Sequence, residues 1–312
     1  MINPIAPVAL LIDAAIGWPQ WLYRLIGHPV GGFARVIGWC ETNWNRLEHS
    51  AIRKRFFGVV TLLILVSLAL IAGLALETLS YALLKQWGWI AVGIFAWPAL
   101  AQRSLYVHVR PVAEALAKGD VEAARSAVSR IVGRDTAELD EAGIARAAIE
   151  SLAESFCDGI AAPLFWLLVA GLPGIWAYKA INTADSLVGH VEEPWRDFGW
   201  ASARTDDFAN YLPARISGLT LCFAAPGGWA VLWRDHARHA SPNAGWPEAA
   251  MAGALRVALA GPVSYDGEMN DKAWIGREGG KAGAQDIRNA LSIYLRACAL
   301  LWIFAGLVVW AL

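Results

Sequence analysis

The hydrophobic positions of the chain gather into long blocks that polar segments separate. Residues 56–76 contain no charged side chain and follow directly on the basic segment Arg53-Lys54-Arg55. Residues 86–102 form a second uncharged block, and residues 297–312 form a third. An α-helix needs about 20 apolar residues to cross a bilayer. The pattern therefore predicts membrane-spanning helices, with a helical hairpin over the first two blocks.

Three other apolar blocks carry interruptions. Residues 5–23 form a weaker first span, while residues 159–178 contain Pro163 and a Gly-Leu-Pro-Gly stretch. Residues 216–233 contain Pro226-Gly227-Gly228. Proline and glycine free backbone groups that need other partners inside lipid. We therefore expect an all-α, polytopic integral membrane protein with about four full spans and two broken segments, each of which is a kinked span or a re-entrant pair of half-helices.

The polar segments are expected to belong to the same fold. We predict a single membrane-embedded domain over residues 1–312, with a helical polar loop over residues 104–158 and a second polar loop over residues 234–292. The first loop is rich in Ala, Glu and Arg, with apolar positions at helical spacing. Asp120, after a glycine, is the expected N-cap of one of its helices. In the second loop, residues 249–260 have a helical, small-residue composition.

Composition supports the membrane class and excludes others. The chain is 57% hydrophobic and 17% charged, against about 25% charged residues in soluble domains. Its net charge of −1 argues against a nucleic-acid partner, which would need a basic face. The four cysteines are too scattered for a zinc site or a disulfide framework. Several of the 17 tryptophans stand at block ends, as in an interfacial aromatic belt, and the basic flanks of the spans place those flanks in the cytoplasm.

A row of acidic residues is the first candidate for chemistry. Glu150, Glu154 and Asp158 are spaced four apart, so on a helix they share one face. One interpretation is a solvated acidic stripe. The other is a Mg²⁺ site, because hard cations prefer carboxylate oxygens and bridge to phosphates.

Further polar groups cluster at the ends of apolar blocks. Residues 179–186 hold five polar side chains in eight positions, which is more than simple helix capping needs if the segment is buried. Residues 204–215 combine adjacent aspartates with arginines, a combination suited to metal and phosphate, although a turn with a helix N-cap is the alternative. Asp13 lies within an apolar run, where acids are usually functional. His28, in the segment Gly27-His28-Pro29-Val30, is a further candidate. Asn243 and Glu248 are candidates for capping the helix that comes after them.

These segments, in their order and spacing, resemble the CobD/CbiB family of cobalamin biosynthesis along most of the chain. The segments that carry the resemblance are Asp13 with Gly17 and Pro19, His28-Pro29-Val30, Gly133-Arg134-Asp135-Thr136, Glu150 with Glu154 and Asp158-Gly159, Ala162-Pro163-Leu164, 178–183 with Asp185-Ser186 and Gly189, Phe198-Gly199, Ala203-Arg204 with Asp206-Asp207 and Asn210, Pro213-Ala214-Arg215, and 241–245. Two positions depart from the family pattern, because Ser155 stands where asparagine is usual and Leu187 where methionine is usual.

The resemblance implies an ATP-dependent ligase of the adenosylcobinamide-phosphate synthase type. Such an enzyme joins aminopropanol or its phosphate to a propionate carboxylate of adenosylcobyric acid, with ATP and Mg²⁺ as cofactors. Applied to this sequence, it suggests three groups of residues. The catalytic candidates are Asp185, His28 and Lys179. The candidates for binding substrate or nucleotide are Asp13, Arg134, Asn182, Ser186, Arg204, Asn210, Arg215 and Asn243. The candidates for holding the metal and handling the amine are Glu150, Glu154, Asp158, Asp206 and Asp207.

The expected setting is the cell inner membrane, with several crossings and the active loops facing the cytoplasm, where ATP and the corrinoid are found. Membrane lipid and other enzymes of the cobalamin pathway are the expected partners. Two other functions fit the sequence. A polytopic transporter would also have broken helices and intramembrane polar groups. A non-catalytic membrane regulator of the AmpE type would share the fold.

Overall fold

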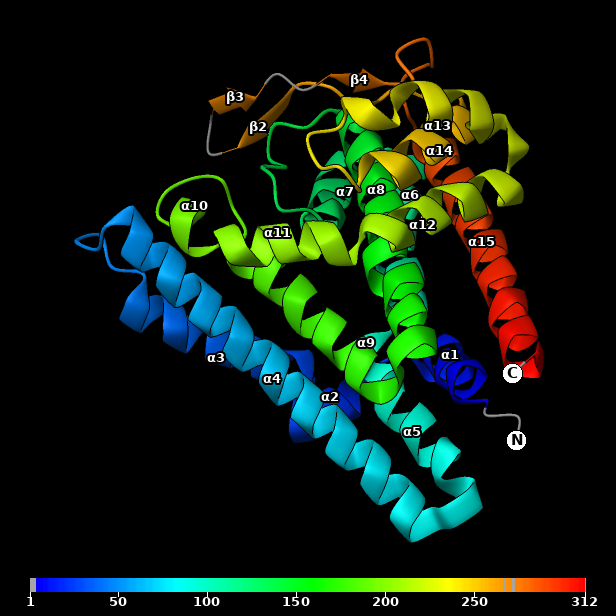
Figure 1. Cartoon of the computed structure of the whole chain (residues 1–312). Coiled ribbons are helices and arrows are strands. Elements are labelled where there is room, and N and C mark those ends of the chain that lie inside the picture. Colours follow the sequence, from blue (N-terminus) through cyan, green and yellow to red (C-terminus); the bar gives the residue numbers. More distant parts are fainter. Residues whose placement is uncertain (1–3, 266–267, 271–272, 312) are drawn as a thin grey trace. The chain divides into compact units, whose positions relative to one another are not determined.

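The computed structural model describes residues 4–265, 268–270 and 273–311 (Figure 1). Residue 312, the end of the predicted final span, and residues 266–267 and 271–272 of the predicted second polar loop lie outside this range. The chain forms two compact units. The first comprises Met1–Ala101, Ala162–Asn210 and Ala305–Leu312, and the second comprises Gln102–Ala161 and Tyr211–Phe304. The expectation of one membrane-embedded domain stays a prediction.

The first unit is built around two long apolar helices. Its helices are α1 (Ile5–Ile16), α2 (Gln20–Ile26), α3 (Val30–Trp44), α4 (Ala51–Leu84), α5 (Gly88–Ala96), α9 (Ala162–Val188), α10 (Trp195–Phe198) and α11 (Trp200–Ala209). Helices α4 and α9 pack side by side (Figure 1). Large apolar side chains of α4 such as Leu63, Ile71 and Leu74 are exposed. An exposed row of this kind on one long helix suits contact with lipid.

The second unit is mainly helical and carries short strands. Its elements are α6 (Gln102–Ala117), α7 (Val121–Val128), α8 (Glu141–Phe156), the π-helical turn η3 (Cys157–Ala161), α12 (Tyr211–Ala224), the 3₁₀ turns η4 (Pro226–Gly228) and η5 (His236–Arg238), α13 (Trp229–Asp235), α14 (Gly245–Leu255), β1 (Leu259–Ala260), β2 (Val263–Tyr265), β3 (Glu268–Asn270), β4 (Trp274–Ile275) and most of α15 (Ala284–Ala311). β1 pairs with β4, and β2 with β3, both antiparallel.

The predicted all-α membrane class is confirmed. Among the described residues, three helical stretches are long and apolar enough to cross a membrane: Ala51–Ala117, Glu141–Val188 and Ala284–Ala311. Helices α1 and α2 count as a fourth if the pair, bent by 107°, is one span. The predicted breaks are also present, because α9 loses helical geometry at Ala170 and Gly171 and the turn η4 separates α12 from α13.

The second polar loop differs from the sequence prediction. Helix α14 ends at Leu255, where Arg256 adopts a left-handed φ of 57°, so the helix predicted over residues 249–260 begins too late and extends too far. Leu259 and Ala260 instead pair with Ile275 and Trp274. This pairing partner lies far along the chain, and tertiary contacts of this kind override local helix propensity. The N-cap predicted at Asp120 is confirmed, since its carboxylate accepts a hydrogen bond from Ala123 N at 3.0 Å.

A glutamate of α4 caps the break inside α9. Gly171 has φ +62°, a conformation that favours glycine. The helix resumes at Leu172, whose N–H donates to Glu77 Oε2 at 3.1 Å. Glu77 thus satisfies an N–H at the start of the half-helix 172–188, where a negative charge is also favourable.

Removing this cap is expected to destabilise the first unit. We expect Glu77→Ala to lower the free energy of unfolding by about 1 kcal/mol, as loss of an N-cap does, and Glu77→Gln to lower it less because its amide oxygen still accepts. Thermal unfolding of the purified protein in detergent measures both. Equal melting temperatures for the alanine variant and the wild type would contradict the capping role.

A buried carboxylate anchors the loop after β4 to α13. Asp235 is fully buried and accepts two hydrogen bonds from Arg234 and one from Gly276 N, the last at 2.9 Å. Arg238 lies 3.2 Å from it. The hydrogen bonds from Arg234 are the main cause that lowers the pKa of Asp235 below its usual value. The carboxylate therefore contributes stability above about pH 4, the unfolded value, and loses it as the pH falls through the lower folded value.

We expect Asp235→Asn to cost about 2 kcal/mol of unfolding free energy at pH 7, because it leaves buried donors unmatched. The difference from the wild type should shrink as the pH falls below about 4, because the carboxyl of the unfolded wild-type chain then becomes protonated and the unfolded state gains stability relative to the folded state. Melting temperatures measured from pH 7 to pH 3 test this. A difference that stays constant over this interval would show that the charge of Asp235 has no role in stability.

Candidate functional site

The first unit gathers a cluster of polar side chains around Asp206. The half-helix 172–188 supplies Asn182, whose Nδ2 donates to Asp206 Oδ1 at 3.4 Å. Helix α11 supplies Asp206, and Asn210 at its end donates to Asp206 Oδ2 at 3.0 Å. Tyr178 OH donates to Asn210 Oδ1 at 3.0 Å. Because all four side chains are buried, the carboxylate is held in one orientation by two amides.

Two cations lie at the edge of this cluster. Lys179 Nζ donates to Asn182 Oδ1 at 3.3 Å, so it is joined to the Asp206 cluster through that amide. Arg204 Nη1 donates to Asp207 Oδ2 at 3.1 Å, with most of its side chain exposed. Partial burial raises the pKa of Asp207, and the charge of Arg204 opposes this rise. The first unit thus places Lys179 and Arg204 next to the carboxylates of Asp206 and Asp207.

Asp185 lies close to the same carboxylates. Its charge interacts with those of Asp206 and Asp207. Gly189 packs against it so closely that an added Cβ would lie 2.0 Å from Asp185 Oδ1. A side chain at Gly189 would therefore displace the Asp185 carboxylate. Ser186, next to Asp185, donates to Asn182 O at 2.9 Å, a bond within the helix.

His28 and Asp13 also belong to the first unit. His28 Nδ1 accepts a hydrogen bond from Val30 N at 3.2 Å, and its ring meets Trp18 edge to face. With Nδ1 accepting, the neutral ring carries its proton on Nε2. Burial, followed by the charge of Lys179, lowers the pKa of His28, so the ring is neutral at pH 7. Asp13 is buried in α1.

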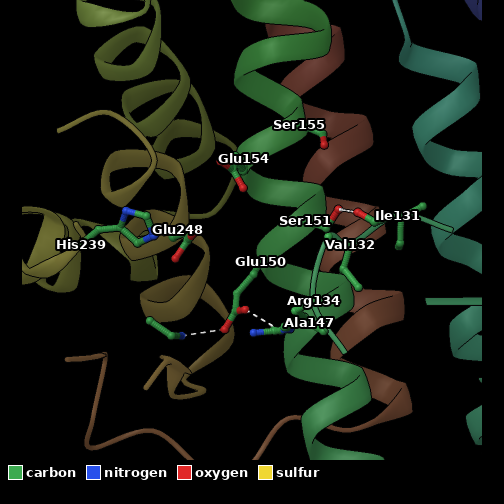
Figure 2. A pocket seen from close by; sticks show the side chains of 12 residues that line it. Ile131, Val132, Arg134, Ala147, Glu150, Ser151, Glu154, Ser155, His239 and Glu248 are labelled. Atoms are coloured by element: carbon green, nitrogen blue, oxygen red, sulfur yellow. Dashed lines mark hydrogen bonds and ion pairs between the residues drawn. The ribbon is translucent and has the colours of Figure 1, made fainter. Parts of the chain in front are cut away.

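The second unit contains a polar pocket of about 200 Å³ (Figure 2). The segment that ends at Arg134, helix α8, helix α14 and the turn that holds His239 form its walls. Figure 2 shows Glu150 and Glu154 on the side of α8 that faces Glu248 and His239. The full lining is Ile131, Val132, Gly133, Arg134, Ala147, Glu150, Ser151, Glu154, Ser155, His239, Glu248 and Ala260.

Glu150 forms the centre of an ion-pair network in this pocket. Its Oε2 accepts from Arg134 Nη2 at 2.7 Å, and its Oε1 accepts from Ala260 N at 2.6 Å. Arg146 Nε lies 3.8 Å from Glu150 Oε1. Ser151 Oγ donates to Ile131 O at 2.6 Å and holds the Arg134 segment against α8. Two arginines and a backbone N–H thus already balance the charge of Glu150.

The predicted acidic row is divided by a change of helix type. Glu150 and Glu154 lie on α8 and line the same pocket. Asp158 lies in the π-helical turn η3 and is not among the residues that line it. A π-turn inserts extra residues per turn and rotates the residues that follow. The spacing of four predicted a common face on the assumption of an uninterrupted α-helix.

Arg215 and Asn243 lie elsewhere in the second unit. Arg215 Nη1 donates to Asn243 Oδ1 at 3.3 Å. Its guanidinium stacks 3.5 Å from the ring centre of Tyr211 and 4.9 Å from that of Trp246. Ser241 Oγ accepts from the backbone N–H groups of Asn243 and Ala244, in the turn before α14.

Sequence reasoning missed two pocket residues. Glu248 was considered only as a helix cap, and His239 was not considered. His239 Nε2 lies 3.6 Å from Glu248 Oε1, and Glu248 is almost fully buried. The available signal was Glu248 itself, an acid that follows Trp246-Pro247 in an otherwise apolar helix. Acids in such surroundings are rarely buried without a function.

The donor sets fit Mg²⁺ only as an ion shared with phosphates. Within the described ranges, no group of three or more His, Cys, Asp or Glu side chains has the geometry of a metal site. Mg²⁺ with a nucleotide needs only one or two carboxylates, with phosphate and water oxygens as its other ligands. Either Asp206 or Asp207 meets this smaller requirement by itself, because adjacent residues of α11 point in different directions.

Comparison with known proteins decides the family. The family description "CobD/Cbib protein" matches residues 6–294. The chain belongs to the CobD/CbiB family. This confirms the resemblance seen in the sequence motifs, and it makes the chain a member of a family of cobalamin biosynthesis.

Individual CobD proteins are similar along nearly the whole chain. "Cobalamin biosynthesis protein CobD" of Rhodobacter capsulatus is 48% identical over 307 residues, covering 96% of this chain and 95% of that protein. The CobD of Sinorhizobium sp is 44% identical over 97% of this chain and 96% of its own length. That of Brucella suis biovar 1 is 44% identical, over 97% and 94%. No solved structure matches the chain.

Proposed function

We propose that this CobD/CbiB protein is an ATP-dependent amide ligase that joins aminopropanol or its phosphate to a propionate carboxylate of adenosylcobyric acid. One observation carries the proposal. Residues of two separate family segments, Tyr178 and Asn182 on α9 and Asp206 and Asn210 at α11, bond to one another around a buried carboxylate. Such buried polar networks are costly unless fully satisfied, and they are typical of functional sites.

The chemistry requires activation of a carboxylate. A carboxylate is a poor acyl donor, so its oxygen attacks the γ-phosphorus of ATP to form an acyl phosphate and ADP. The amine nitrogen then attacks the acyl carbon, the C–N bond forms, and inorganic phosphate leaves with the C–O bond electrons. Phosphoryl transfer of this kind depends on positioning and on neutralising charge.

The residues of the first unit suit these steps. Lys179 and Arg204 neutralise phosphate oxygens, while Asn182 and Asn210 orient the substrate through their amides. Asp206 or Asp207 would hold Mg²⁺, which neutralises the phosphates of bound ATP. Asp185 accepts the proton of the attacking amine, because only a neutral amine is nucleophilic. His28 is less suited to this role, since its acceptor nitrogen already binds Val30 N.

The second unit contributes further candidates. Arg134 and Arg215 suit anionic oxygens, and Asn243, held by Arg215, suits an amide contact to substrate. Glu154, and less directly Glu150 and Asp158, would handle the amine or a metal ion. We place the protein in the inner membrane with these groups on the cytoplasmic side, where ATP and the corrinoid are found.

The direct test is an assay of the purified full-length protein in detergent. Adenosylcobyric acid, ATP and Mg²⁺ are supplied with aminopropanol or with its phosphate, and mass spectrometry follows the corrinoid. We expect an amide product and one ADP per amide with at least one of the amines. Absence of product with both, from protein with a cooperative unfolding transition, would refute the ligase proposal. Corrinoid transport by the same protein in vesicles would then support the transporter alternative.

A further inference from the structure

Helix α12 of the second unit carries an apolar stripe on its outward face. The stripe consists of four residues spaced at i, i+4, i+7 and i+11, which share one face of a helix: Leu212, Ile216, Leu219 and Phe223. Leu212 and Phe223 are 55% and 69% exposed, and the two residues between them are half-exposed. The opposite face of α12 packs on α14. An exposed apolar row of this kind marks a contact with a partner or with lipid.

The polar side chains beside the stripe have partners within the protein. Thr220 Oγ1 donates to Ile216 O, one turn earlier in the same helix, at 2.7 Å. Arg215 is the charged residue of α12, and its guanidinium is held by Asn243 Oδ1 and by the ring of Trp246. Polar groups next to hydrocarbon need internal partners of this kind, because no water is present to replace them. The stripe can therefore face lipid without leaving the hydroxyl of Thr220 unsatisfied.

A hydrogen bond fixes the level at which α12 ends. Arg296 Nη1 of α15 donates to Ala224 O, at the last residue of α12, at 3.2 Å. Arg296 directly precedes the uncharged block 297–312, and α15 is long and apolar enough to cross a membrane. An arginine that flanks a span lies at the boundary between hydrocarbon and water. The end of α12, which includes Phe223, therefore lies at this boundary.

The segment that contains α12 does not have the form of a spanning helix. The 14 residues of α12 extend over about 21 Å at 1.5 Å per residue, against about 30 Å of hydrocarbon. Helix α13 does not prolong it, because α12, the turn η4 and α13 all pack against α14, which has only 11 residues. Helix α12 also runs across the direction of α15 (Figure 1). The broken block 216–233 is thus folded back on α14.

We propose that α12 is an interfacial helix, which lies in the plane of the bilayer surface and buries its apolar stripe in the leaflet that α15 enters at Arg296. The partner of the stripe is the lipid surface itself. Interfacial helices insert their apolar face by about 5–10 Å. The ring of Phe223 meets that of Trp229 at a centroid distance of 5.2 Å, and tryptophan is enriched at this depth. The contact anchors the second unit to the bilayer beside α15.

The test uses nitroxide spin labels on the full-length protein in nanodiscs of phosphatidylcholine and phosphatidylglycerol. Labels are attached to Leu212→Cys and Phe223→Cys, and the wild type, whose four cysteines are buried, gives the background. Power-saturation EPR measures collisions with oxygen, which concentrates in lipid, and with a nickel chelate, which stays in water. We expect oxygen-dominated collisions at both positions, at depths that agree within about 5 Å because the helix lies in the plane of the surface.

Two positions of the same unit calibrate the measurement. Ser126→Cys places a label on the exposed side of α7, a helix of the polar loop, and should collide mainly with the nickel chelate. Ile303→Cys places one on the exposed face of α15 within its uncharged block, and should lie deeper in the hydrocarbon than both α12 labels. Leu219→Cys, in the middle of the stripe, replaces Phe223→Cys if loss of the Phe223 ring lowers the melting temperature.

Three results would overturn the inference. Nickel-dominated collisions at Leu212 and Phe223, as at Ser126, would show that the stripe faces water. A difference in depth of about 16 Å between the two labels, the rise of 11 helical residues, would show that α12 crosses the leaflet instead of lying in its plane. Low collision rates with both reagents would show that protein covers the stripe, and dipolar broadening of the spectra would then identify that protein as a second copy of the chain.

Discussion

Asp206→Asn is expected to lower kcat for amide formation by about 100- to 1,000-fold, the usual cost of removing one preorganised electrostatic group. The substitution removes the negative charge that Asn182 and Asn210 orient and places an amide opposite two amide donors. Steady-state ADP release and amide formation measure the change. Because the new amide nitrogen faces one of these two donors, the substitution also costs stability, so kcat is compared only for protein that shows a cooperative unfolding transition.

The matched control is Asp120→Asn in the second unit. Asp120 is an exposed N-cap, and asparagine caps helices about as well as aspartate. We expect this variant to keep wild-type kcat and stability. Wild-type turnover by Asp206→Asn would exclude the Asp206 cluster from the reaction.

Asp185→Asn is expected to lower kcat by about 100- to 10,000-fold, the range for loss of a general base. Because the base acts after the amine has bound, KM for the amine should change little. The loss should shrink as the pH approaches about 10, near the pKa of an ordinary alkyl ammonium, because a larger fraction of the amine then arrives neutral. Rates measured from pH 7 to pH 10 test this expectation.

A purely structural role of Asp185 predicts a different pattern. The asparagine variant would then show the same relative loss at every pH, together with a lower melting temperature. Arg204→Gln provides a contrast. It removes a proposed phosphate contact, so it should raise KM for ATP while the pH dependence of the rate stays close to that of the wild type. A pH-independent loss in Asp185→Asn would therefore contradict the assignment of the base.

The membrane architecture could be predicted because it depends on composition over long segments. The uncharged block 56–76 lies within α4, and the Pro and Gly residues of 159–178 mark the break at Gly171. A lipid environment imposes these features directly, since unsatisfied backbone groups are costly there. The extent of α14 could not be predicted, because it depends on strand pairing between residues that are distant in sequence.

The candidate residues were predictable as a set, but their partners were not. Residue type and family resemblance selected Asn182, Asp206 and Asn210, which do contact one another. Nothing in the sequence linked Glu150 with Ala260 N, because that contact joins α8 to a strand 110 residues later. Asp158 lies in the π-turn η3, and the spacing of acidic residues gives no signal for such a turn.

The claim that ATP activates the substrate carboxylate is tested most directly by following its oxygen atoms. Adenosylcobyric acid labelled with ¹⁸O in the reacting carboxylate is converted by the purified protein, and the inorganic phosphate is analysed by mass spectrometry. An acyl phosphate transfers one labelled oxygen to phosphate, so we predict one ¹⁸O in each phosphate for each amide formed from doubly labelled acid. Amide formation with unlabelled phosphate would contradict the mechanism.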